Sequence, residues 1–206
     1  MHVLDGMLLA FRTTGIISLM ASAVVPAAGS ASRFGGGKLF ALVDGVPLLD
    51  RTLGALLDGG IAHIVVVTPA EPDWGGVVAR LRDRRVSRAI NPDPSPGMFS
   101  SIQIGLRAAA AGPIAILPGD MPFVSANTVR QLIETAERTR GLVSPRLHGR
   151  RGHPLLMPID LRDAVLAAPP PAMLNDVLRP YASRVVNVDV DDPGVVRDVD
   201  VKADLG

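Results

Sequence analysis

Short apolar runs recur along the chain, each separated from the next by a longer stretch of mixed character. Most of these runs show no polar alternation and are rich in Val, Ile, Leu and Ala. Continuous apolar character over such a length is typical of strands buried on both faces of a parallel sheet. The runs predict strands at residues 21–25, 64–67, 86–90, 114–117, 142–144 and 185–190.

Between the runs, apolar residues recur at three- and four-residue spacing, as on the buried side of a helix. Pro47 suits a first helical turn, and Ser125 and either Ser100 or Ser101 suit helix N-caps. The predicted helices cover residues 47–57, 74–82, 101–111, 126–138, 161–167 and 173–181.

The alternation of strand and helix predicts an α/β fold. We expect a three-layer α/β/α arrangement in which a mostly parallel, Rossmann-like sheet carries helices on both faces. Such sheets bind ligands at the carboxyl ends of their strands, near a switch in strand order. The residues that directly follow 21–25 and 114–117 are therefore the first candidates for a site.

The length of 206 residues fits one domain whose core needs no cross-links. We predict a single domain of residues 21–206 and a dispensable extension of residues 1–20. Met20 stands just before the first strand and is a candidate for the true start of the protein. A small N-terminal helix is the alternative interpretation of the extension.

Composition excludes several functional classes. The net charge is only +1, from 21 Lys and Arg against 20 Asp and Glu, which excludes a general nucleic-acid-binding surface. The absence of cysteine excludes disulfides, thiolate metal sites and cysteine nucleophiles. Aromatic residues, at 3%, are too few for base-stacking platforms. No apolar run approaches the roughly 18 residues of a membrane span, so we expect a cytoplasmic protein without a membrane partner.

Residues 24–38, with the sequence VVPAAGSASRFGGGK, form the first candidate site. Gly29 and the glycines at 35–37 accompany two cations, Arg33 and Lys38. Small residues let backbone N–H groups approach a ligand, and successive N–H groups in a turn form an anion-binding nest. Two cations beside such a nest favour a polyphosphate ligand. A flexible surface loop is the alternative.

This loop is neither a Walker A motif nor a dinucleotide fingerprint. Ser32 and Leu39 stand where a Walker A motif would have Gly and Ser or Thr. The nearest acidic candidate after the second strand, Glu71, lies 42 residues beyond Gly29 (71 − 29), whereas about 20 would be expected for a dinucleotide site.

Asp120 directly follows the predicted strand 114–117, inside the sequence PGDMP. A carboxylate at a strand end near a phosphate loop is the expected ligand of Mg²⁺. The alternative is an Asp in a Pro-Gly turn. Asp198 and Asp200 form a D-x-D pattern near the C-terminus, where an acidic helix start is the alternative and is better fitted by Asp204.

A cluster of basic side chains occupies residues 146–153: Arg146, His148, Arg150, Arg151 and His153. A hairpin or loop of this charge suits an anionic second substrate. The alternative is a solvated basic turn. His153 is a candidate for a structural role, and we do not assign it as a general base.

Together these motifs resemble the MobA-like nucleotidyltransferases of the molybdenum cofactor group, and most closely the molybdenum cofactor cytidylyltransferases. The resemblance runs from residue 21 to residue 205. It is carried by AAGSASRFGGGK at 27–38, by LFALVDGVPLL at 39–49, by GMFSS at 97–101 and by RGHP at 151–154. The tail DVDVKADL at 198–205 resembles the family's D-I-D-T-P-E-D-L, with Lys-Ala in place of Pro-Glu.

The resemblance implies roles for the matched residues. Arg33, Lys38 and Asp120 would be catalytic, and Asp120 with Asp200, in preference to Asp198, would bind Mg²⁺. The nucleotide would be bound by Ala27, Ala28, Gly29, Arg33, Lys38, Thr68, Asn91, Gly97, Met98, Ser100 and Ser101. The acceptor would be bound by Arg146, Arg151 and His153.

The implied reaction transfers CMP from CTP to molybdopterin and releases pyrophosphate, with a molybdenum hydroxylase as an expected partner. Ala27-Ala28-Gly29 agrees with the cytidylyl members, whereas guanylyl members tend to have a second Gly there, and the Ala28 methyl group would crowd a purine. The alternatives are a sugar or polyol phosphate acceptor and a GTP-using homologue. Two further alternatives, an NAD(P)-dependent oxidoreductase and a non-catalytic cofactor chaperone, belong to other functional classes.

Overall fold

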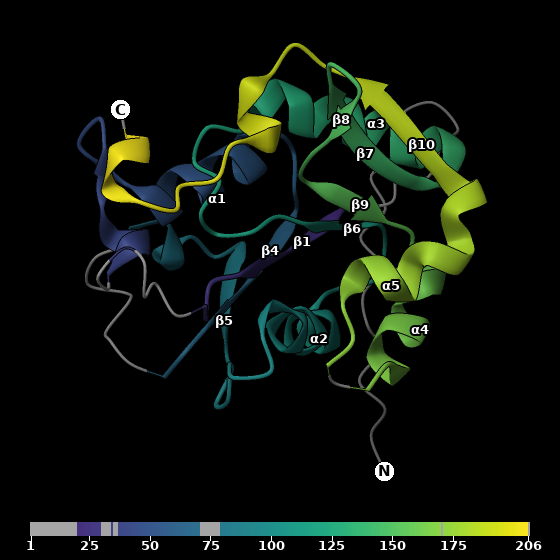
Figure 1. Cartoon of the computed structure of the whole chain (residues 1–206), viewed down its shortest axis with the longest axis horizontal. Coiled ribbons are helices and arrows are strands. Elements are labelled where there is room, and N and C mark those ends of the chain that lie inside the picture. The colour runs from purple at the N-terminus through teal and green to yellow at the C-terminus, as the bar shows by residue number, and fades with distance from the viewer. Residues whose placement is uncertain (1–19, 30–33, 35–36, 71–78, 170, 206) are drawn as a thin grey trace.

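The computed structural model, which describes residues 20–29, 34, 37–70, 79–169 and 171–205, contains a mostly parallel sheet (Figure 1). In spatial order its path is β10 (Val185–Asp189), β7 (Leu142–Leu147), β9 (Leu155–Met157), β6 (Ile114–Ile116), β1 (Ser22–Pro26), β4 (His63–Thr68) and β5 (Val86–Ile90). Strand β8 (Arg150–Arg151) pairs with β7 off this path. β9 is antiparallel to both of its neighbours, and the other pairs along the path are parallel.

Strand β1 lies in the middle of the sheet, and all of its residues are buried. Val24 pairs with Val65 of β4 on one side and with Ile116 of β6 on the other. Because side chains alternate across a strand, Ala23 and Val25 contribute to one core cluster and Val24 to the other. Burial on both faces explains the unbroken apolar run in the sequence.

Helices cover both faces, which confirms the three-layer prediction (Figure 1). On one face, α1 (Leu48–Asp58) and α3 (Ala126–Thr139) pack against the sheet. On the other lie α2 (Met98–Ala108), α4 (Arg162–Ala167) and α5 (Leu174–Leu178). α2 approaches β1 so closely that a Cβ at Gly105 would lie 2.3 Å from Cγ1 of Val24.

The helix predicted at 101–111 was wrong at both ends, since α2 ends at Ala108. α2 begins at Met98, and Gly97 is its N-cap with φ 99°, a conformation that favours glycine. Ser100 therefore lies inside the helix rather than at its cap. The cap predicted at Ser125 is confirmed, because its hydroxyl accepts a hydrogen bond from the Thr128 N–H at 3.1 Å.

Several short elements were not predicted. β9 is new, as is a hairpin of β2 (Leu42–Val43) and β3 (Val46–Pro47), so Pro47 ends a strand just before α1. β8 forms an antiparallel hairpin with β7, which is one of the two interpretations given above for the basic segment. Of the predicted helix at 74–82, residues 74–78 lie outside the described residues and the rest is the 3-10 helix η3 (Ala79–Arg82). The predicted helix 173–181 is α5 followed by the 3-10 helix η5 (Arg179–Arg184).

The predicted N-terminal extension, apart from Met20, lies outside the described residues. Among the helices that the structure describes, none is long and apolar enough to cross a membrane.

Candidate active site

The carboxyl ends of β1 and β6 lie side by side because the two strands are neighbours in the sheet. The Gly119 N–H donates to the Pro26 carbonyl at 3.0 Å, and the Thr52 hydroxyl of α1 donates to the Gly119 carbonyl at 3.1 Å. A Cβ on Gly119 would lie 3.2 Å from Cδ1 of Leu49 and 3.4 Å from Cβ of Ala27. The segment leaving β6 is thus pressed against the segment leaving β1, and the next residue is Asp120.

Lys38 reaches Asp120 from the other side of this junction. It is the first residue of the 3-10 helix η1 (Lys38–Phe40), after Gly37 with φ 65°. Its Nζ donates to Oδ2 of Asp120 at 2.8 Å and to Oδ1 of Asp200 at 3.2 Å. The Lys38 side chain is 11% exposed, against 23% for Asp120 and 46% for Asp200. Three residues far apart in the sequence therefore meet around one ammonium group.

A third carboxylate completes an acidic cluster. Ligand oxygens of Asp120, Asp198 and Asp200 all lie within 4.8 Å of one another. The tail is held in place by the Val199 N–H, which donates to the Asp120 carbonyl at 3.0 Å, while the Val199 side chain is buried beside Leu48. The burial of Val199 and this hydrogen bond fix the segment that carries Asp198 and Asp200 beside Asp120.

Asp204 fixes the turn that carries Asp200. Its Oδ2 accepts the N–H groups of Asp200 and Val201, each at 2.8 Å. Those backbone donors, Val201 first and then Asp200, hold the pKa of Asp204 below its usual range. This agrees with the structural role that the sequence favours for Asp204.

The electrostatics of the cluster are those of a cation site. Burial lowers the pKa of Lys38, but hydrogen bonds to Asp120 and Asp200 and their negative charges outweigh that effect and raise the pKa above its ordinary value. Lys38 is therefore charged at neutral pH, and three carboxylates leave the cluster with an excess of negative charge. Carboxylate oxygens are the ligands of hard divalent cations. The three carboxylates fit such an ion, and the Lys38 ammonium group is the positive charge that two of them contact in this structure.

The glycine loop is described only in part. Ala27 and Ala28 are buried behind β1, and Gly29 is exposed. Arg33 and two of the loop glycines lie outside the described residues. Gly37 and Lys38 form the described end of the loop. Of the two predicted cations, Lys38 is therefore the one whose contacts the described residues show.

A second group of predicted nucleotide residues forms an internal network. The Asn91 side-chain amide, at the end of β5, donates to the hydroxyls of Ser100 and Ser101 at 3.0 and 2.9 Å. Thr68, at the end of β4, is buried, and its hydroxyl accepts from Arg88 Nε at 2.7 Å. These contacts fasten the ends of β4 and β5 to the start of α2, where Gly97 and Met98 are exposed.

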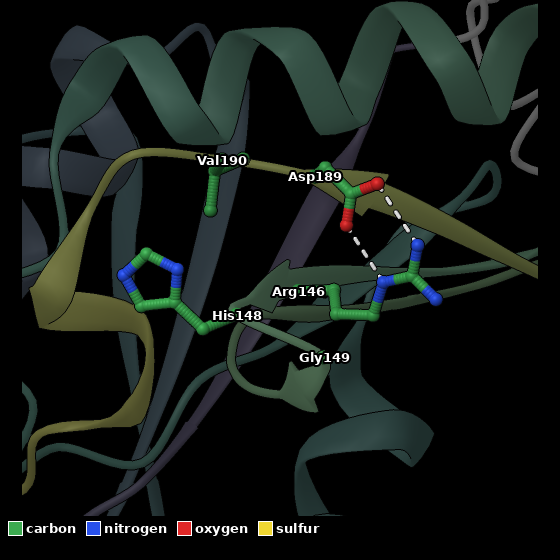
Figure 2. Close-up of a pocket in the computed structure, with 5 residues that line it drawn as sticks. All are labelled: Arg146, His148, Gly149, Asp189 and Val190. Carbon is green, nitrogen blue, oxygen red and sulfur yellow. Dashed lines mark hydrogen bonds and ion pairs between the residues drawn. The ribbon is translucent and has the colours of Figure 1, made fainter.

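The predicted basic cluster lies in two places: Arg146 and Arg151 contact β10, whereas His153 lies near the acidic cluster. Arg146 of β7 donates through Nε and Nη2 to the Asp189 carboxylate of β10 at 2.6 and 2.9 Å, and Arg151 of β8 donates to the Asn187 side chain at 2.9 Å. Figure 2 shows the first pair beside the β7–β8 turn, with His148 on the side of Val190. A cavity of about 540 Å³ lies here, lined by Arg146, His148, Gly149, Asp189 and Val190.

His153 belongs to the acidic side of the site. Burial lowers its pKa, although a hydrogen bond to the Ile116 backbone and the charges of Asp120 and Asp198 oppose the shift. Its Nδ1 is buried without a hydrogen-bond partner among the described residues. His153 is therefore a neutral imidazole near the carboxylates at neutral pH, and it does not add a positive charge to the basic cluster.

Sequence reasoning missed the partners of these side chains. Asp189 and Asn187 lie two residues apart on β10 and therefore on one face, opposite Arg146 and Ser144 in the register. The spacing was visible in the sequence, but the register that brings these residues to β7 was not. Arg88, which also donates to the carbonyls of Pro69 and Ala70, gave no sequence signal.

Residues 23–185 match the model of the MobA-like NTP transferase domain family. The chain belongs to this family. The matched residues therefore form a nucleotidyltransferase domain. Divalent metals are common in such enzymes, and the acidic cluster fits one.

Solved structures agree with this assignment. A nucleotidyl transferase from Methanothermobacter is 27% identical to this family member, with a TM-score of 0.72 and coverage of 90% of this chain and 94% of the other. Two structures support the fold alone. One is a Mycobacterium tuberculosis protein in complex with manganese (21% identity, TM-score 0.67, 90% and 95% covered). The other is 4-diphosphocytidyl-2C-methyl-D-erythritol synthase from Anaerococcus prevotii (16% identity, TM-score 0.71, 92% and 94% covered).

Among curated proteins, the bifunctional protein GlmU of Clavibacter sepedonicus is 28% identical over 116 residues. That stretch is 53% of this chain but spans only 23% of GlmU. The likeness therefore concerns a part of the larger protein.

Proposed function

We propose that this nucleotidyltransferase transfers CMP from CTP to molybdopterin, with release of pyrophosphate. The observation that carries the chemistry is the meeting of Lys38, Asp120 and Asp200 at the carboxyl ends of β1 and β6. The cytidylyl preference is supported by the resemblance at residues 27–29, where the Ala28 methyl group would crowd a purine. We assign this activity to a domain of residues 21–206 and regard residues 1–20 as dispensable.

In the proposed reaction, a phosphate oxygen of the acceptor attacks the α-phosphorus of CTP. One P–O bond forms while the bond from the α-phosphorus to the bridging oxygen breaks, and the electron pair leaves with pyrophosphate. No covalent protein intermediate is required, so positioning and charge neutralisation carry the catalysis. Arg33 and Lys38 are proposed to neutralise the negative charge of the triphosphate.

We assign metal binding to Asp120 and Asp200, with Asp198 close enough to assist. Bound Mg²⁺ would polarise and orient phosphate oxygens. The assignment is supported by the all-carboxylate donor set within 4.8 Å and by the ammonium group that already occupies a cation position there. The manganese complex of the Mycobacterium tuberculosis relative is consistent with it.

The nucleotide is proposed to lie along the ends of β1, β4 and β5. Gly29, Gly97 and Met98 are exposed there and available for contact. Thr68, Asn91, Ser100 and Ser101 are engaged with one another or with Arg88, so we propose that they mainly hold the nucleotide-facing backbone in position.

The acceptor is proposed to approach over the β7–β8 hairpin. Arg146 and Arg151 remain the candidate anion ligands, but each is held by a residue of β10, so an acceptor phosphate would have to compete with Asp189 for Arg146. His153, neutral and close to the acidic cluster, is proposed to contact the acceptor as a hydrogen-bonding group.

Pyrophosphate release tests the proposal. It should be measured with each of the four nucleoside triphosphates and Mg²⁺, with and without molybdopterin, beside an NAD(P)H absorbance control. We expect release only with acceptor present and fastest with CTP. Equal rates with GTP would overturn the base preference, CTP binding without release would favour a non-catalytic chaperone, and a change in NAD(P)H absorbance would favour an oxidoreductase.

A polyol or sugar phosphate acceptor is the second candidate. The structural neighbour from Anaerococcus prevotii is by its name a synthase of a cytidyl-linked polyol, and its fold covers this chain almost throughout. The same assay with a panel of polyol and sugar phosphates separates the two acceptors. A molybdenum hydroxylase partner and a cytoplasmic location remain predictions.

A further inference from the structure

Lys38 lies where a metal ion would be expected to lie. Its Nζ contacts two of the three carboxylates whose oxygens converge within 4.8 Å. We propose that Lys38 is the resident cation of the acidic cluster, and that a divalent ion enters only when a nucleoside triphosphate draws Lys38 away. The inference rests on the proposed function and adds an order of events to it.

Two cations cannot share these carboxylates without strong repulsion. A divalent ion would sit about 2.0–2.6 Å from its carboxylate oxygens. Lys38 Nζ already lies 2.8 Å from one such oxygen and 3.2 Å from another. Two cations bound to the same oxygen would therefore be less than about 6 Å apart, and their repulsion in a partly buried site is large compared with thermal energy. Metal binding to the nucleotide-free protein is therefore penalised.

A triphosphate removes the penalty. Its oxygens offer the ammonium group an alternative set of negative partners next to the cluster, because Lys38 belongs to the loop that we propose binds phosphate. The flexible four-carbon stem of lysine lets the charge move without a backbone change. The carboxylates are then left for the metal, which also gains phosphate oxygens as ligands.

The chain shows elsewhere how a permanent carboxylate anchor is built. Asp192 is buried and accepts hydrogen bonds from the Ser125 N–H, the Thr128 hydroxyl and the Gly194 N–H, at 2.9, 2.6 and 3.0 Å. These donors are fixed by the backbone and by short side chains. The Lys38 contacts differ, because the donor is a long side chain and the Asp200 side chain is half exposed. These differences favour replacement of the Lys38 ammonium group by another cation.

The wild-type protein offers a direct test because it contains only two lysines, Lys38 and Lys202. Labelling lysine at Cε with carbon-13 gives two side-chain resonances, which the variant Lys202→Met assigns. We expect millimolar Mg²⁺ alone to leave the Lys38 resonance in place, and Mg²⁺ with a non-hydrolysable α,β-methylene CTP analogue to move it. If Lys38 does not shift while phosphorus NMR reports a bound analogue, the inference is overturned.

Metal affinity provides the second measurement. Free Mn²⁺ is followed by electron paramagnetic resonance during titration of the nucleotide-free proteins. Lys38→Met should bind Mn²⁺ about tenfold or more tightly than the wild type, because the competing charge is gone. Lys202→Met is the matched control and should bind like the wild type, since Lys202 is exposed. Equal affinities in the wild type and Lys38→Met would overturn the inference.

Pyrophosphate release by the same wild-type sample separates this inference from the proposed function. Tighter Mn²⁺ binding by Lys38→Met without any release by the wild type would reject the transferase and keep Lys38 as the resident cation. Release by the wild type with unchanged Mn²⁺ affinity in the variant would keep the transferase and reject the exchange.

Discussion

At the scale of single residues, the site is governed by one ammonium group among three carboxylates. Lys38 is nearly buried, and its contacts with Asp120 and Asp200 keep it charged. In the proposed reaction this charge is needed most as the triphosphate separates into CMP and pyrophosphate. A residue that stabilises charge developing in the transition state affects turnover more than substrate affinity.

Lys38→Ala should therefore lower kcat/KM for CTP by about 30- to 1,000-fold, or about 2–4 kcal/mol of transition-state stabilisation. The physical reason is the loss of a positioned positive charge beside the triphosphate. Steady-state pyrophosphate release gives the ratio, and Lys202→Ala is the control that should retain activity. Near-normal turnover of Lys38→Ala would argue against the proposed role.

His153 should make stability depend on pH. Burial lowers its pKa in the folded state, whereas the unfolded chain has a pKa of about 6.5. Above that value both states are neutral and His153 has no effect. Below it the unfolded state binds the proton more readily, so the free energy of unfolding falls as the pH drops toward the folded pKa.

Thermal unfolding between pH 7 and pH 5 measures this effect. The wild type should lose more stability across this range than His153→Gln, which cannot take up a proton. Other groups titrate equally in both proteins, so the difference between the two curves isolates His153. Parallel curves would contradict a depressed pKa at this position.

At the scale of elements, close packing of α2 on β1 depends on Gly105. Gly105→Ala should destabilise the protein by about 1–3 kcal/mol, because the added Cβ would lie 2.3 Å from Val24 Cγ1 in a filled core. Urea unfolding gives the change in the free energy of unfolding. Gly54→Ala in α1 is the helical control, since the atoms nearest to its Cβ would belong to the flexible end of Arg80, at 3.0 Å. Equal effects of the two substitutions would show that packing at Gly105 is not limiting.

The elements also show how far the sequence leads. The parallel strands were predictable because burial on both faces leaves an apolar run, as in β1 and β4. β9 was missed because it contributes only three residues, Leu155–Met157, and its antiparallel direction leaves no pattern of its own. The start of α2 was misplaced because Gly97, rather than a serine, caps it.

The same limits apply to the site. Lys38 and Asp120 could be brought together from sequence, because each follows a strand that ends at one edge of a parallel sheet. The pairing of Arg146 with Asp189 could not, because it depends on the register of two strands whose contacting residues are 43 positions apart. Local pattern predicts which edge a residue occupies, but long-range register decides its partner.

At the scale of the whole molecule, the proposed ligand set joins distant parts of the chain. Asp120 lies 82 positions and Asp200 162 positions beyond Lys38 in the sequence. The segments that carry the two carboxylates are joined by a backbone hydrogen bond from the Val199 N–H to the Asp120 carbonyl. A ligand that binds all three stabilises the folded state only, because the unfolded chain does not assemble the site.

CTP and Mg²⁺ together should therefore raise the melting temperature. At a ligand concentration about 100 times the dissociation constant the stabilisation is about 2.7 kcal/mol. For a chain of this length that corresponds to a shift of about 5–10 °C. Differential scanning fluorimetry with CTP and Mg²⁺, CTP with EDTA, Mg²⁺ alone, and GTP with Mg²⁺ gives the comparison.

Mg²⁺ alone should shift the melting temperature of the wild type little, since Lys38 occupies the cluster, and GTP with Mg²⁺ should shift it less than CTP with Mg²⁺. A full shift with Mg²⁺ alone would contradict a cluster closed by Lys38, and an equal shift with GTP would contradict the base preference.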